Sequence, residues 1–68
     1  MPKIPILTDK EIILLIEKQG FVFLRQKGSH KIFRKDGQNI IVPCHGKPLK
    51  RGLTAKILKD AGINLTDI

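Results

Sequence analysis

His30 stands in the tetrapeptide Lys27-Gly28-Ser29-His30, between two short apolar runs of a chain whose net charge is +7. Histidine is the side chain whose ordinary pKa, ~6.5, lets it exchange protons near neutral pH. Gly28 can adopt a positive φ, and the Ser29 hydroxyl can donate to an anion held at the turn. The tetrapeptide therefore predicts a tight turn that presents a histidine beside anion-binding groups. An ordinary turn carrying a surface histidine is the alternative.

Basic residues are concentrated in the middle and second half of the chain. Ten of the thirteen lysines and arginines lie between Arg25 and Lys59, with Asp36 as the one acidic residue in that stretch. Such a cluster is typical of phosphate binding, although it is also compatible with a merely soluble basic surface. We expect the phosphate-binding residues to be Lys27, Lys31, Arg34, Lys47, Lys50, Arg51 and Lys56.

Length and composition limit the class of protein. The 68 residues predict one domain over residues 1–68, and Cys44, as the single cysteine, favours a reducing compartment. The proline-containing start of the chain lacks the apolar region of a signal peptide. The longest apolar run, residues 12–16, is far shorter than the about 20 residues of a membrane span. We expect a soluble cytoplasmic protein with no membrane partner.

Two helices are predicted, one near each end. Thr8 and Glu11 have the spacing of a capping box, and Gly20 offers a terminator, which predicts a helix over residues 9–19. Leu53, Ile57, Leu58 and Ala61 recur at helical spacing before Gly62 and predict a second helix over residues 50–61. Residues 64–67 are expected to cap one further turn.

Three strands are predicted between the helices, over residues 21–24, 31–34 and 40–42. Asp36-Gly37 is a hairpin signal. A loop of either two or four residues around it sets Phe33 opposite Ile40. Phe33, Ile40 and Val42 then share the core face, whereas His30, Ile32 and Arg34 share the other. The sequence thus predicts an α+β fold of order α-β-β-β-α, similar to a double-stranded-RNA-binding domain, with two helices on one face of a three-stranded antiparallel sheet.

With these elements placed, the chain resembles the HicA family of toxin ribonucleases from HicA–HicB toxin–antitoxin pairs. The resemblance runs from residue 20 to residue 63. It is carried by Gly20-Phe21, by residues 25–30 with Phe33, by Val42-Pro43 with His45, by Leu49-Lys50 and Gly52, by residues 57–59 and by residues 61–63. One departure is visible, because the family usually reads Gly-Thr-Leu where this chain has Gly52-Leu53-Thr54. Any role borrowed for that threonine is therefore in doubt.

The resemblance implies metal-independent cleavage of mRNA that arrests translation, and inhibition by a cognate HicB-like antitoxin. The family's catalytic histidine corresponds to His30, and Gly28 and Ser29 match the turn that supports it. Operator DNA would be contacted only indirectly, through the antitoxin complex. No cofactor and no metal are expected.

The chemistry of the residues agrees with this expectation. A neutral His30 can take the proton of a ribose 2′-hydroxyl so that the oxygen attacks the adjacent phosphorus, and nearby cations can stabilise the charge that develops. His45 is the one candidate for a second acid, and spacing does not say whether it approaches His30. Cys44-His45 alone makes neither a structural zinc set nor a recognisable thiol nucleophile.

Two further functions remain open for such a chain. One is an RNA-binding module that uses the same fold without catalysis. The other is a component of an antitoxin complex that binds operator DNA. Fold alone does not separate these from a ribonuclease.

Overall fold

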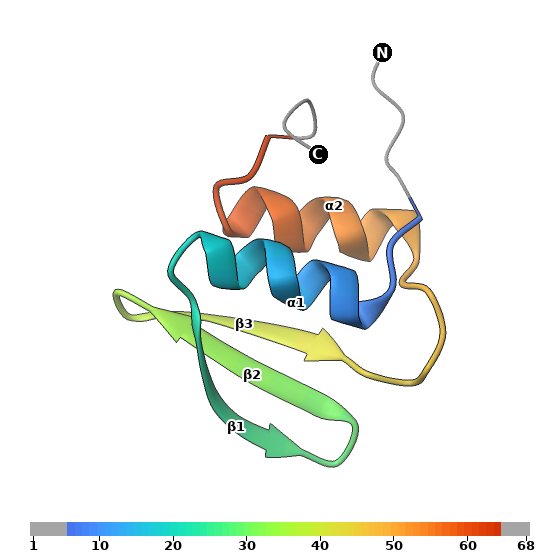
Figure 1. The fold of residues 1–68 in the computed structure, drawn as a ribbon, viewed down its shortest axis with the longest axis horizontal. Coiled ribbons are helices and arrows are strands. Elements are labelled where there is room, and N and C mark those ends of the chain that lie inside the picture. Colours follow the sequence, from blue (N-terminus) through green and yellow to red (C-terminus); the bar gives the residue numbers. More distant parts are fainter. Residues whose placement is uncertain (1–5, 65–68) are drawn as a thin grey trace.

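The computed structural model of the protein describes residues 6–64, and all but the first residue of the further turn expected at residues 64–67 lies outside the described residues. The elements follow in the order α1 (Asp9–Lys18), β1 (Val22–Lys27), β2 (His30–Lys35), β3 (Gln38–Pro43) and α2 (Arg51–Asp60). Both helices lie on one side of the sheet (Figure 1). The predicted α-β-β-β-α fold of the double-stranded-RNA-binding-domain type is confirmed.

Helix α1 begins at the predicted capping box. The Thr8 side chain accepts from the Glu11 amide, and the Glu11 carboxylate accepts from the Thr8 amide. The helix ends one residue earlier than expected, because Gln19 is its C-cap and Gly20 follows at φ 100°. Lys35 Nζ donates to the Gln19 carbonyl and ties the tip of the β2–β3 hairpin to this end of α1.

The sheet is an antiparallel meander in the order β1-β2-β3. The β2–β3 turn has the predicted form, since Asp36 and Gly37 both have positive φ, as a type I′ turn requires. Phe33 pairs with Ile40 and Ile32 with Ile41, so the predicted register is confirmed. Strand β1 begins one residue later and ends three residues later than predicted, and it carries a bulge between Phe23 and Arg25. The bulge leaves the register of β2 and β3 unchanged.

The core lies between the sheet and the helices. It contains the predicted Phe33, Ile40 and Val42 together with Ile12 and Ile16 of α1 and with Ile57, Leu58 and Ala61 from α2 and its C-cap. Both helices contact β3, which is covered on its helix side. Strand β1 extends beyond this cover, and Phe23 is therefore 53% exposed although its ring contacts Phe33 edge-on.

The burial of two apolar side chains does not follow from the period of their elements alone. Ile32 lies on the outer face as predicted, yet it is only 8% exposed. It occupies the central strand, between Arg25 of β1 and Ile41 of β3. Leu53 was expected on the buried stripe of the second helix and is instead 36% exposed, while Thr54 is fully buried. No helix within residues 6–64 is long and apolar enough to cross a membrane.

Candidate functional site

The turn before β2 positions His30. Lys27 and His30 are paired across the β1–β2 hairpin, which leaves Gly28 and Ser29 as its two loop residues. Gly28 has φ 60°, the positive φ that a type II′ hairpin turn needs at its first central position. Gln26 Nε2 donates to the Gly28 carbonyl at 2.9 Å. His30 is the first residue of β2, and its side chain is exposed.

His45 contacts His30. The centroids of the two imidazole rings are 5.8 Å apart and the ring planes are inclined at 88°, an edge-to-face contact. Two backbone features bring the rings together. His30 is paired with Pro43 at the end of β3. The Cys44 amide then donates to the Ser29 carbonyl at 2.6 Å, and His45 follows directly.

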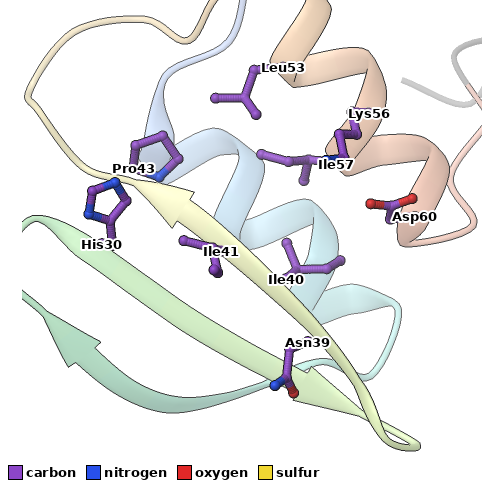
Figure 2. Close-up of a pocket in the computed structure, with 9 residues that line it drawn as sticks. All are labelled: His30, Asn39, Ile40, Ile41, Pro43, Leu53, Lys56, Ile57 and Asp60. Carbon is purple, nitrogen blue, oxygen red and sulfur yellow. The ribbon is translucent and has the colours of Figure 1, made fainter.

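A groove of about 370 Å³ runs from His30 between β3 and α2. Figure 2 shows the His30 ring beside Pro43 at one end of the groove, with Leu53, Lys56 and Asp60 along the helix. Gln38 Nε2 donates to the Asp60 carbonyl at 2.6 Å and joins the start of β3 to the end of α2. We call this space the strand–helix groove. It is lined by His30, Asn39, Ile40, Ile41, Pro43, Leu53, Lys56, Ile57 and Asp60.

A second groove, of about 630 Å³, lies under the loop that joins β3 to α2. We call it the loop groove. It is lined by Pro43, His45, Lys47, Pro48, Leu49, Lys50 and Leu53. Pro43 and Leu53 line both grooves, and each groove contains one of the two histidines. The imidazole pair therefore lies where the two grooves meet.

Four of the predicted phosphate-binding residues lie around the histidines. Lys47 and Lys50 line the loop groove, Lys56 lines the strand–helix groove, and Lys27 is paired with His30 in the sheet. All four are exposed. Arg51, the first residue of α2, is exposed next to Lys50. Each groove is therefore lined by at least one ammonium group as well as by one imidazole, which favours an anion in it.

Two other predicted phosphate-binding residues lie outside the two grooves. Lys31 is paired with Val42, so it belongs to the helix-side face of the sheet and is half-buried. Arg34 is on the face of His30 and is exposed, but it follows four residues further along β2, roughly 13 Å at the rise of an extended strand. Neither lines either groove.

Cys44 is half-buried and packs against the core. Its Sγ lies 3.5 Å from the Val42 carbonyl, to which the thiol donates. Burial raises the pKa of this thiol, and the neighbouring Asp9 raises it further, although Lys31 acts in the opposite direction. The thiol is therefore protonated at neutral pH and is a poor nucleophile. Within residues 6–64, no three histidine, cysteine or acidic side chains are grouped as a metal ion would need.

Sequence reasoning missed the place of Leu53. The chain departs from the order of the resembled family at residues 53 and 54, and this departure was the available signal. In the structure it places an aliphatic side chain where the two grooves meet and a threonine in the core.

The fold and the histidine pair define a small basic protein of the double-stranded-RNA-binding-domain type with imidazoles at a groove junction. The sequence model of one family, described as HicA toxin of bacterial toxin–antitoxin, matches residues 10–63. Because this match covers most of the 68 residues, the chain belongs to the HicA toxin family. Membership makes it the toxin component of a toxin–antitoxin system, with a cognate antitoxin as its partner. No curated protein matches the chain.

Proposed function

We propose that this toxin is a metal-independent endoribonuclease that cleaves mRNA and so arrests translation in the cytoplasm. The observation that supports this proposal most directly is the position of His30. Its imidazole is exposed at the junction of two grooves that lysines flank. A ribose–phosphate chain lying across that junction brings a 2′-hydroxyl to the ring.

His30 acts as the general base in this reaction. Its neutral imidazole takes the proton of the 2′-hydroxyl, and the 2′-oxygen forms a bond to the adjacent phosphorus. The bond from phosphorus to the 5′-oxygen breaks. The products are a 2′,3′-cyclic phosphate and a 5′-hydroxyl end. One positioned base accelerates such a step by ~10²–10⁴.

Lysines around the junction supply the electrostatic part of the mechanism. Negative charge grows on the non-bridging oxygens as the phosphorane forms, and fixed cations stabilise it. We assign this role to Lys47 and Lys50, which line the loop groove, and to Lys56, which lines the strand–helix groove. We assign positioning of the strand to Lys27, the cross-strand neighbour of His30, and to Arg51 at the start of α2.

The partner of the site is the antitoxin. We propose that a HicB-like protein blocks the groove junction, and that acidic side chains on it oppose the lysines. Operator DNA is reached only through the antitoxin in this proposal.

The test uses purified toxin and a 5′-labelled RNA in the presence of EDTA. Wild-type protein should cleave the RNA, and His30→Ala should lower the rate by ~10²–10⁴. An RNA with a 2′-deoxy sugar at the cleaved linkage should stay intact, since the attacking oxygen is missing. Lys18→Ala, an exposed change on α1, is the control that should cleave normally.

Two outcomes would contradict the proposal. If wild-type toxin binds the RNA tightly and leaves it intact, the protein is a docking module. If it binds neither cleaved nor intact RNA but retains operator DNA together with its antitoxin, its role lies in that regulatory complex.

A further inference from the structure

The contact between His30 and His45 has a chemical consequence that goes beyond a single base. The two rings come from segments fifteen residues apart, and both are exposed. They are held at 5.8 Å, edge to face, by the pairing of His30 with Pro43 and by the hydrogen bond from the Cys44 amide to the Ser29 carbonyl. Since regular pairing and a backbone hydrogen bond fix both sides, the fold itself positions the second imidazole.

Cleavage of an RNA linkage needs two proton transfers. A base removes the proton of the 2′-hydroxyl, and an acid must protonate the 5′-oxygen, which otherwise leaves as a strongly basic alkoxide. The attacking and leaving oxygens lie in line on opposite sides of the phosphorus. A base and an acid that act on one phosphodiester must therefore be neighbours that reach opposite oxygens. Two imidazoles in contact, one in each groove, satisfy this condition.

Other side chains around the junction are poorer acids. Lysine holds its proton with an ordinary pKa of ~10.4 and gives it up reluctantly near neutral pH. Among the described residues that line the grooves, Asp60 alone carries a carboxyl group, and it lies at the far end of α2 from Leu53. The Cys44 thiol donates to the Val42 carbonyl and packs against the core. Among the residues lining the two grooves, His45 is the proton donor that contacts His30.

We propose that His45 is the general acid of this ribonuclease, an inference that rests on the proposed function. The protonated His45 imidazole gives its proton to the 5′-oxygen while the bond from phosphorus to that oxygen breaks. His30 meanwhile gains the proton of the 2′-hydroxyl. Each turnover leaves His30 protonated and His45 neutral, and exchange with solvent restores both rings.

The decisive experiment compares two substrates that differ in one bridging atom. The cleaved linkage of a short RNA is mapped first, and a second RNA is made with sulfur in place of the 5′-oxygen at that linkage. A thiolate leaves without protonation, so this substrate does not need a general acid. It still needs the base.

His45→Ala should slow cleavage of the oxygen substrate by ~10²–10⁴ and should cleave the sulfur substrate at a rate close to that of wild type. His30→Ala should be slow on both substrates. His45→Gln is the second variant, since it keeps a polar side chain at an exposed position and should show the same rescue. Lys18→Ala should match wild type on both substrates.

Three results would overturn the inference. His45→Ala equally slow on both substrates would make His45 a positioning residue, and full activity on the oxygen substrate would remove it from the reaction. Rescue of His30→Ala instead of His45→Ala would reverse the two roles. A different result tests the proposed function itself: if the wild-type toxin leaves the oxygen substrate intact, both proposals fail together.

Discussion

His30 depends on a glycine for its position. Gly28 has φ 60°, and a Cβ built there would meet no atom within 4 Å. Sterics with neighbouring side chains therefore do not select glycine at this position. The backbone conformation does, because residues with a Cβ pay for the left-handed region. Gly52 offers a matched contrast, since it also has open space around it but lies inside α2 without a positive φ.

The same substitution at these two glycines should have opposite effects. Gly28→Ala should lower the free energy of unfolding by about 1 kcal/mol, the cost of a left-handed residue with a Cβ. Gly52→Ala should raise it by up to about 0.5 kcal/mol, because alanine is the better helix former but position 52 lies in the first turn of α2. Urea unfolding followed by circular dichroism measures both values. A shift of the same sign in the two variants would contradict the conformational explanation.

Helix α2 both packs against the core and lines the two grooves, and the apolar period of its sequence does not tell which residues do which. Leu53 continues the helical apolar period but faces the grooves, whereas the next residue, Thr54, is fully buried. Within residues 6–64, no group forms a hydrogen bond with the Thr54 hydroxyl. A buried hydroxyl without a partner has lost its hydration without compensation, and this destabilises the folded state.

Replacing this threonine by a residue of the same shape should therefore stabilise the protein. Thr54→Val exchanges the hydroxyl for a methyl group and should raise the free energy of unfolding by about 1 kcal/mol. Thr54→Ala removes the hydroxyl and leaves space behind, so it should be less stable than Thr54→Val by about 2 kcal/mol. Thermal or urea unfolding measures the order of the three proteins. A lower stability of Thr54→Val than of wild type would show that the hydroxyl is satisfied in solution.

Local signals predicted most of the elements, and long-range contacts explain what they missed. The capping box at Thr8 and the Asp36-Gly37 turn each involve only a few neighbouring residues. The residue types in these short segments therefore predicted where α1 begins and how β2 pairs with β3. Because successive side chains of a strand point to opposite faces, the sequence predicted His30 on the face away from the core. The same alternation puts Lys31 on the helix-side face. The contact of His45 with His30 depends on where β3 ends relative to the β1–β2 turn. No spacing within one segment encodes that.

The whole molecule presents a positive surface to its partners. The chain carries thirteen basic residues against six acidic ones, and Lys47, Lys50 and Lys56 line the two grooves that meet at the histidines. Polyanions approach such a surface faster and bind it more tightly at low ionic strength. In the function proposed above, an acidic antitoxin opposes the same charges as RNA, so its association should share this dependence.

RNA affinity should therefore fall steeply with salt. For single strands the logarithm of the binding constant falls by ~0.7 per phosphate contact for each decade of salt, so three lysine contacts give a slope of about −2. Fluorescence anisotropy with His30→Ala, which keeps the RNA intact, measures this slope. Adding Lys56→Ala to that variant should reduce the slope by ~0.7. Adding Lys18→Ala should leave it unchanged, and an equal change in both would indicate a diffuse field instead of defined contacts.

The hydrogen bond between Cys44 and Ser29 uses an amide and a carbonyl of the main chain alone. Nineteen of the twenty amino acids supply that amide at position 44, and proline is the exception. The contact between the two imidazoles therefore depends on the path of the backbone, and this hydrogen bond does not require a particular side chain at position 29 or 44. A transplant of this site into another scaffold should first reproduce the hydrogen-bonded approach of the β1–β2 turn to the segment after β3, and only then the side chains.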